Sequence, residues 1–234
     1  MKLEFKPVEG TFLKTTRETN FPVRRVFCVG RNYEAHAREM GKDPNREPPF
    51  FFTKWAETVV DAAPEDSVTI PYPPETSNYH HEAELVVAIG RTGRRISVEK
   101  AEEYVFGYAV GLDMTRRDRQ LEARDLGRPW SVGKNFENSC PTGRLLPTDG
   151  GSHITTGAIH LRVNSELRQS ADISDLIWSV PEIITDLSKF YELHPGDLIY
   201  TGTPAGVGPV NPGDKISCTI DGLPPMSVTI GPQV

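Results

Sequence analysis

Three acidic side chains lie beside apolar runs, where they can share a cation. Glu82 and Glu84 flank Ala83 at the start of an apolar stretch, and Asp113 follows a second one. Successive side chains of a strand point to opposite faces, so Glu82 and Glu84 point the same way. Two carboxylates on one face repel each other unless a positive group lies between them, and hard divalent cations take oxygen ligands. The alternatives are an edge strand with a solvated acidic face and, for Asp113, a helix cap.

A histidine and a glutamate three residues apart form a candidate general base. His36 and Glu39 share one face if this segment is helical. A carboxylate that accepts from one imidazole nitrogen raises the basicity of the other nitrogen, which lets the pair activate water. The alternative is a surface ion pair. Lys134 is interpreted either as a buried cation that stabilises an enolate or as a solvated loop lysine.

Three other features are interpreted as structural. His80 and His81 suggest zinc, but adjacent strand residues face opposite ways, and no cysteine or third histidine has zinc-site spacing. The glycine-rich loop at residues 202–208 lacks the Lys-Ser/Thr pair of a phosphate loop. Cys28 lies inside an apolar run, so we expect it to be an inert core residue.

The elements that must position these residues are mainly strands. Apolar runs predict strands at residues 25–30, 50–52, 82–89, 105–112, 159–163, 197–201, 216–220 and 226–230. Patterning predicts helices at residues 32–41, with Asn32 as the cap and Gly41 at the end, and at residues 116–126 and 177–187. Strands outnumber helices and no regular β-α-β alternation is present, so we expect a mainly β (α+β) fold rather than a doubly wound one.

Length and composition limit the remaining possibilities. The 234 residues fit one catalytic domain at residues 21–234, preceded by an N-terminal arm or small hairpin at residues 1–20. The net charge of -6 argues against nucleic acid as a partner. The three cysteines are far apart, and we find neither a signal peptide nor a membrane span, so we expect a cytoplasmic protein.

In chain order, these segments resemble the fumarylacetoacetate hydrolase family. The resemblance runs from about residue 22 to residue 232, which is nearly the whole chain. The matching stretches are 28–33 with His36 and Glu39, 81–84, 107–108 with 111–118, Lys134, 196–204 and 206–208. One departure is Trp55 after Lys54, where the family pattern has proline, and this change would reshape the entrance to the site.

The resemblance implies a fold, an assembly and a metal site. It implies a mixed β-sandwich roll that forms a homodimer. It implies Mg²⁺ or Mn²⁺, or Ca²⁺ in a crystal, on Glu82, Glu84 and Asp113.

The resemblance also implies roles for the other candidate residues. His36 and Glu39 would activate water, and Lys134 would assist catalysis. The expected substrate contacts come from Arg31, Arg117, Gln120 and Thr203. Thr203 is expected near the substrate carboxylate, and Arg31 or Arg117 near a distal carboxylate.

Segments 21–26, 46–52 and 113–120 are most similar to the family branch that acts on acylpyruvates. The expected substrate is a small 2,4-dioxo acid such as 3-fumarylpyruvate, whose C3–C4 bond is hydrolysed to give pyruvate and fumarate. Two alternatives within the family use the same 2-oxo acid chemistry: oxaloacetate decarboxylation and isomerisation of 2-hydroxyhepta-2,4-diene-1,7-dioate. A third alternative is a non-catalytic metal or carboxylate binding module.

Overall fold

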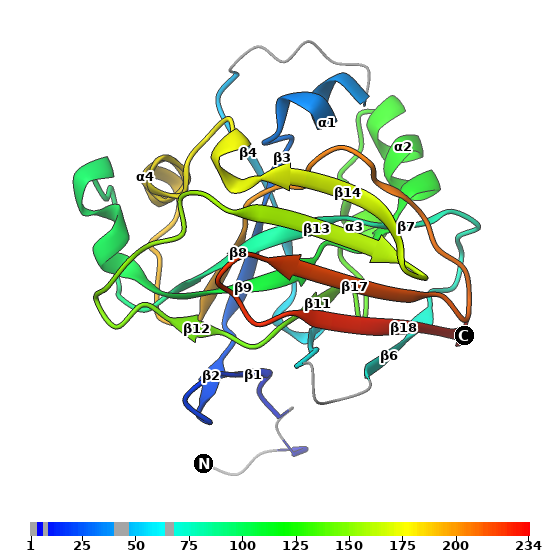
Figure 1. Cartoon of the computed structure of the whole chain (residues 1–234), viewed down its shortest axis with the longest axis horizontal. Helices are drawn as coiled ribbons and strands as arrows, with labels where there is room; N and C mark the ends of the chain where they lie inside the picture. Colours follow the sequence, from blue (N-terminus) through cyan, green and yellow to red (C-terminus); the bar gives the residue numbers. More distant parts are fainter. Residues whose placement is uncertain (1–3, 7–8, 40–46, 64–67) are drawn as a thin grey trace.

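The computed structural model describes residues 4–6, 9–39, 47–63 and 68–234, without the side chains of residues 37 and 39. Strands account for 41% of the chain and helices for 19%, arranged as a curled mixed sheet. The mainly β fold predicted from the sequence is therefore confirmed, and Figure 1 shows the strands crossing the centre of the molecule with the helices at its periphery.

A large mixed sheet carries most of the predicted strands. In spatial order it contains β4 (Phe50–Lys54), β3 (Arg25–Gly30), β15 (Asp197–Tyr200), β8 (Ala83–Ile89), β9 (Val105–Leu112), β11 (Cys140–Thr142) and β5 (Val59–Asp61), with β12 (Leu146–Pro147) also paired to β9. The pairs β3–β15 and β5–β11 are parallel, whereas β8 runs antiparallel to both of its neighbours.

A five-stranded sheet packs against the large one. Its order is β14 (Glu166–Asp172), β13 (Ala158–Val163), β17 (Lys215–Ile220), β18 (Met226–Gln233) and β6 (Val68–Tyr72). The predicted C-terminal hairpin is β17 with β18. A small sheet of β10 (Thr115–Arg116), β7 (Tyr79–His81) and β16 (Gly208–Pro209) lies at the end of the structure that carries the acidic residues.

The N-terminal segment forms a hairpin of β1 (Phe12–Lys14) and β2 (Asn20–Pro22). Two side chains of this hairpin, Leu13 and Phe21, are buried and pack in the core with residues of β3 and β8. The hairpin spans residue 20, and the division of the chain at that residue stays a prediction.

Short helices flank the sheets. They are α1 (Glu34–Glu39), α2 (Arg117–Asp125), α3 (Ser131–Lys134) and α4 (Val180–Phe190), with 3-10 turns at Ala56–Thr58, Val98–Tyr104 and Ile173–Asp175. α4 starts three residues later than predicted because Ser179 and Glu182 form a capping box there. Gly41, the predicted end of α1, lies outside the described residues. Within the described chain, no helix combines the length and apolar character needed to cross a bilayer.

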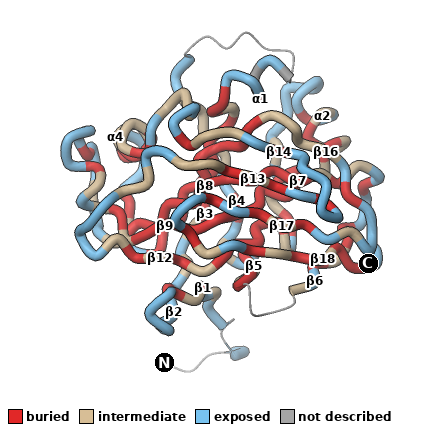
Figure 2. Tube along the Cα trace, in the orientation of Figure 1, coloured by how far each residue is buried: buried red, intermediate tan, exposed pale blue. Residues whose placement is uncertain are grey.

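Strand β8 is buried on both faces (Figure 2), which decides where its acidic neighbours can lie. Leu85 and Val87 pack between the two sheets, whereas Val86 and Ala88 pack against the core on the other side. Glu82 and Glu84 have the same parity as Val86 and Ala88, so they extend this second apolar row. The carboxylates therefore lie inside the protein.

A buried aspartate joins two strands that are far apart in sequence. Asp197 pairs with Arg25 in the register of β15 and β3, and its carboxylate is fully buried. It accepts hydrogen bonds from Arg25 Nε at 2.9 Å and Nη2 at 2.6 Å, from Arg24 Nη1 at 3.2 Å and from the His194 N–H at 2.9 Å. All of these donors stabilise the charged form of the carboxylate.

Replacing Asp197 by alanine is expected to lower the free energy of unfolding by about 2–3 kcal/mol. The loss arises because the His194 N–H and both arginines lose a shared acceptor. Urea unfolding followed by circular dichroism measures the change. The control is Asp125→Ala, which removes an exposed pair with Arg124 and should cost under about 0.5 kcal/mol. Equal effects of the two substitutions would contradict the anchoring role of Asp197.

Candidate active site

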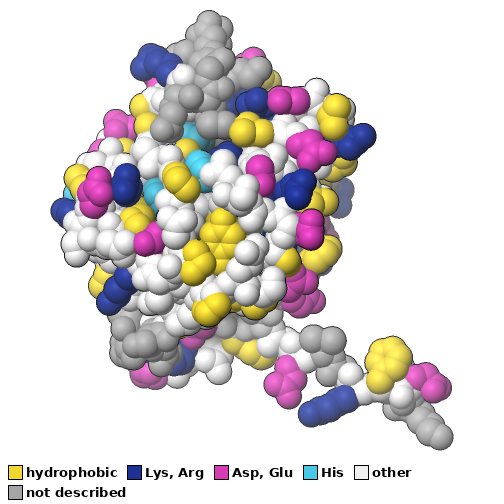
Figure 3. Space-filling model, turned by 90° about the vertical axis from the view of Figure 1, so that its right-hand side faces the viewer, with side chains coloured by type: hydrophobic (Ala, Val, Ile, Leu, Met, Phe, Trp, Pro, Cys, Tyr) yellow, Lys and Arg dark blue, Asp and Glu magenta, His cyan; other side chains and the backbone are white. Residues whose placement is uncertain are grey.

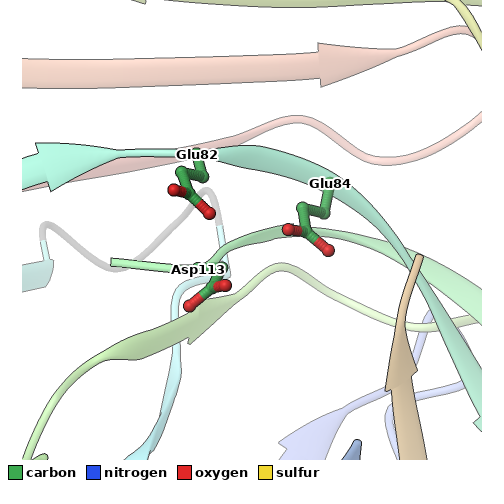
Figure 4. Close-up of side chains that lie close together, drawn as sticks. All are labelled: Glu82, Glu84 and Asp113. Atoms are coloured by element: carbon green, nitrogen blue, oxygen red, sulfur yellow. The ribbon is translucent and has the colours of Figure 1, made fainter. Parts of the chain in front are cut away.

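The three predicted carboxylates meet at one point inside the protein. Glu82 lies between β7 and β8, Glu84 lies on β8, and Asp113 follows β9. Figure 4 shows the two glutamates side by side with their side chains directed toward Asp113. They are 4%, 2% and 1% exposed, and one oxygen from each lies within 4.8 Å of the others. This burial excludes the solvated acidic face, and the all-oxygen donor set fits a hard divalent cation.

Lys134 is a buried cation on this cluster. Its Nζ lies 2.7 Å from Glu82 Oε2 and 2.6 Å from Asp113 Oδ2. The Arg117 guanidinium contacts the other oxygen of Glu82. Burial alone would raise the pKa of Glu82, but Lys134 and Arg117 outweigh burial and lower it below the usual carboxyl range. Of the two interpretations of Lys134, the solvated loop lysine is wrong.

A second lysine holds Asp113 from the protein side. Lys54 lies at the end of β4, is buried, and places its Nζ 2.7 Å from Asp113 Oδ1. It also donates to the carbonyl oxygens of Met114 at 3.1 Å and Ser139 at 2.9 Å. Sequence reasoning missed this residue. The available signal was a lysine two residues after three consecutive phenylalanines, because a charge so close to an apolar run requires a partner if it is buried.

Glu84 is held differently from its two neighbours. One of its oxygens accepts the Gly202 N–H at 2.7 Å, from the loop after β15. Burial, with Asp113 and Glu82 close by, raises the pKa of Glu84 well above the usual carboxyl value. A glycine is required at 202 because φ is +103° and a Cβ there would lie 2.7 Å from Asn32 Cβ. The surroundings of Glu84 thus favour its protonated form, whereas those of Glu82 favour the ionised one.

The prediction that Asn32 caps α1 is wrong, because its side chain is used across the site. The amide donates to the carbonyl oxygens of Thr201 at 2.8 Å and Trp178 at 2.9 Å. Its oxygen accepts the Trp178 N–H at 2.7 Å. Asn32 therefore ties the chain before α1 to the loop that carries Gly202.

A cavity opens onto the carboxylates and collects most of the predicted site residues. Its lining includes Glu82, Glu84, Asp113, Lys134, His36, Arg31, Arg117, Gln120 and Thr203. Sequence reasoning did not select Phe52, Trp130 and Arg124, which line the same cavity. The side chain of Glu39 lies outside the described residues, so its pairing with His36 stays a prediction. His36 itself is buried.

The two candidate arginines have different surroundings. Arg117 is buried and contacts Glu82 and Gln120 through its Nη atoms, and its Nε lies 3.4 Å from His80 Nδ1. Arg31 is partly exposed and lies over the Phe50 ring, 5.0 Å from the ring centroid.

On the face shown in Figure 3, acidic and basic side chains are interspersed, with histidines in its upper half.

Comparison with known proteins fixes the family. Residues 25–231 match the fumarylacetoacetate (FAA) hydrolase C-terminal family. The chain belongs to this family. A fumarylpyruvate hydrolase from a Ralstonia species is 52% identical over 190 residues, covering 81% of this chain and 96% of the relative. A mitochondrial oxaloacetate decarboxylase from Dictyostelium discoideum is 38% identical over 200 residues, covering 86% and 90%.

A solved structure agrees with the sequence match. The crystal structure of fumarylpyruvate hydrolase from Pseudomonas aeruginosa, in complex with Mn²⁺ and pyruvate, superposes with a TM-score of 0.96 at 53% identity. The match covers 98% of this chain and 99% of that one. The predicted family and its fold are confirmed.

Cation binding is expected to release a proton from Glu84, because a ligating carboxylate must be ionised and burial favours its protonated form. Affinity for Mn²⁺ should therefore rise with pH through the range between the usual carboxyl pKa and the raised one. Calorimetry between about pH 5 and 8, in two buffers of different ionisation enthalpy, measures the protons released.

The matched variant is Glu84→Gln, which carries no titrating proton at this position. It should bind Mn²⁺ more weakly and lose this part of the pH dependence. Proton release by the variant equal to that of the unmodified chain would assign the proton to another group.

Proposed function

We propose that this chain hydrolyses the C3–C4 bond of an acylpyruvate such as 3-fumarylpyruvate, giving pyruvate and a carboxylic acid. One observation carries the proposal: the three buried carboxylates share a cavity with His36, Lys134 and Thr203. The Ralstonia and Pseudomonas relatives, each above half identical, are fumarylpyruvate hydrolases. Hydrolysis requires a base near the substrate and a place for anionic charge, and this cavity offers both.

We further propose that Glu82, Glu84 and Asp113 hold Mg²⁺ or Mn²⁺. When bound, the ion supplies Lewis acidity and orients the 2-oxo acid end of the substrate. The oxygen-only ligand set suits either ion. We also propose that the chain works as a homodimer in the cytoplasm, as the family resemblance and the composition suggest.

The chain's own side chains account for the proton transfers. His36 takes a proton from water, and the water oxygen forms a bond to the C4 carbonyl carbon. The C3–C4 bond then breaks, its electron pair stays on C3, and the products are the carboxylic acid and the enolate of pyruvate. The Lys134 ammonium stabilises the anionic charge of this enolate until the His36 imidazolium returns its proton to C3, which gives pyruvate and restores the neutral base. Glu39 is proposed to orient His36.

A substrate panel tests this function. The chain and its His36→Ala variant are assayed with fumarylpyruvate, oxaloacetate and a hydroxydienoate, each with and without Mn²⁺. The unmodified chain should hydrolyse fumarylpyruvate fastest, and His36→Ala should lose about 100-fold or more in kcat while keeping its Mn²⁺ affinity. Faster decarboxylation of oxaloacetate would overturn the hydrolase assignment. No turnover of any member would support a binding module.

Arg31 is proposed to bind the distal carboxylate of the substrate, since the Arg117 guanidinium is already used by Glu82 and Gln120. Arg31→Gln should lower kcat/KM for fumarylpyruvate by about 10- to 100-fold, the value of one charge-assisted pair. For acetylpyruvate, which has no distal carboxylate, the change should stay within about threefold. Equal losses on both substrates would remove Arg31 from this role.

A further inference from the structure

Gln169 is a fully buried amide that the proposed mechanism does not use. It lies on β14, at the edge of the five-stranded sheet, and its side chain reaches the carboxylate site. Its Oε1 accepts the Ala83 N–H at 3.0 Å and lies 3.2 Å from His81 Nδ1. Its Nε2 donates to Thr203 Oγ1 and to the Pro204 carbonyl oxygen, both at 2.8 Å.

The backbone fixes which end of this amide faces which partner. The Ala83 N–H can only donate, so the atom that faces it must be the amide oxygen. The Pro204 carbonyl can only accept, so the atom that faces it must be the NH₂ group. His81 is compatible with this orientation, because its Nδ1 lies 3.2 Å from the same amide oxygen and can donate to it in the tautomer that carries the hydrogen there.

This orientation determines the direction of the Thr203 hydroxyl. An NH₂ group has no acceptor, so Thr203 Oγ1 must accept from Gln169, and its own hydrogen points elsewhere. Thr203 lines the cavity together with Glu82 and Glu84. The hydroxyl is therefore set to donate to an acceptor in the cavity, such as a carboxylate oxygen.

The same amide also fixes where this donor lies relative to the cation ligands. Ala83, whose N–H binds Gln169, separates Glu82 from Glu84 in the chain. One side chain thus links the strand that carries the carboxylates to the loop that carries Thr203. In a 2-oxo acid the carboxylate and the 2-oxo oxygen lie at a fixed separation. The link through Gln169 sets the distance between Thr203 and the cation ligands, and such a ligand must match that distance.

We propose that Gln169 is a positioning residue that turns the hydrogen of the Thr203 hydroxyl toward the cavity and so favours the carboxylate end of a 2-oxo acid there. The inference rests on the proposed function for the identity of the ligand. It explains why a polar side chain from the second sheet is buried beneath the site. It also predicts that the Thr203 donor strengthens the binding of pyruvate, whose charged carboxylate accepts a strong hydrogen bond, more than that of pyruvamide, whose neutral amide oxygen accepts a weaker one.

The test measures binding of pyruvate and of pyruvamide by calorimetry in saturating Mn²⁺. Gln169→Glu keeps an oxygen that faces Ala83 and replaces the NH₂ group by an oxygen to which the Thr203 hydroxyl can donate, while the Pro204 carbonyl loses its donor. Gln169→Met removes the same NH₂ donor without adding a charge. The preference for pyruvate over pyruvamide should fall by about tenfold. Thr203→Val should lose the preference to the same extent, and Thr203→Ser should keep it within about threefold.

The double variant distinguishes positioning from a general structural role. If Gln169 acts through Thr203, Gln169→Met combined with Thr203→Val should bind pyruvate no more weakly than Thr203→Val alone. Independent, additive losses would overturn the proposal. Because Gln169→Met adds no charge, it must lower the preference for pyruvate as Gln169→Glu does; a loss seen with Gln169→Glu alone is an effect of its charge and overturns the role of the NH₂ group. Gln233→Glu, the same change on β18 of the same sheet, is the control and should bind both ligands unchanged.

The outcomes separate this inference from the proposed function. An unchanged preference in folded Gln169→Glu, with Mn²⁺ affinity retained, overturns the role of Gln169 and leaves the hydrolase proposal intact. A collapsed preference supports the role of Gln169, even if the substrate panel shows no hydrolysis. Failure of the unmodified chain to bind pyruvate overturns both.

Discussion

The structure depends on holding three carboxylates together inside a protein. Like charges at this separation repel, and burial raises the free energy of each ionised form. Lysine side chains offset these costs at particular oxygens: Lys134 pairs with Glu82 and Asp113, and Lys54 pairs with the other oxygen of Asp113. Among the residues that the structure describes, the hydrogen-bond donor to Glu84 is a backbone N–H from the loop after β15. Glu84 therefore has less compensation by positive charge than Glu82, and its protonated form is favoured.

The carboxylates and the lysines that neutralise them come from different strands and from one helix, and the architecture brings these elements together. Glu84 lies on a central strand, Asp113 follows the adjacent one, and Lys54 comes from the edge strand β4. Lys134 lies on a helix of four residues whose position is set by its packing against β4 and α2. A curled sheet brings the ends of these strands to one place, so rigid backbone positions the charges and the loops only complete the set.

The sequence predicted the fold well because its signal was strong and local. The run from Val105 to Leu112 matches β9 at both ends, and the prediction that Glu82 and Glu84 point the same way is confirmed, since their carboxylates meet at one cluster. The prediction for α4 was displaced by three residues at both ends: a capping box sets its first residue, and the helix continues to Phe190. The periodicity of apolar residues shows which side chains share a buried face, and this is sufficient to recognise a strand or a helix.

The site was less predictable where contacts are long-range. Glu82, Glu84 and Asp113 could be named as candidates because carboxylates beside apolar strands are unusual, and the family resemblance then favoured a cation site over a solvated face. Lys54 carried a local signal, but nothing in the sequence joined it to Asp113, 59 residues away. Gln169 carried none, because its partners lie 34 to 88 residues away and no spacing rule joins them. Asn32 was misassigned for a related reason: a local cap is the commonest use of asparagine before a helix, and here distant carbonyl groups compete for the amide.

The parallel pairing of β3 with β15 has a consequence for how the chain is made. Arg25 and Asp197 are neighbours in this pairing but lie 172 residues apart in the chain. The loop that binds Glu84 follows β15 directly, so this part of the site forms only after most of the polypeptide has left the ribosome. Contacts of such long sequence separation also slow folding, since a large loop must close before they form. Nascent chains therefore expose apolar strand edges for most of synthesis, and during this period chaperones would be needed to prevent aggregation.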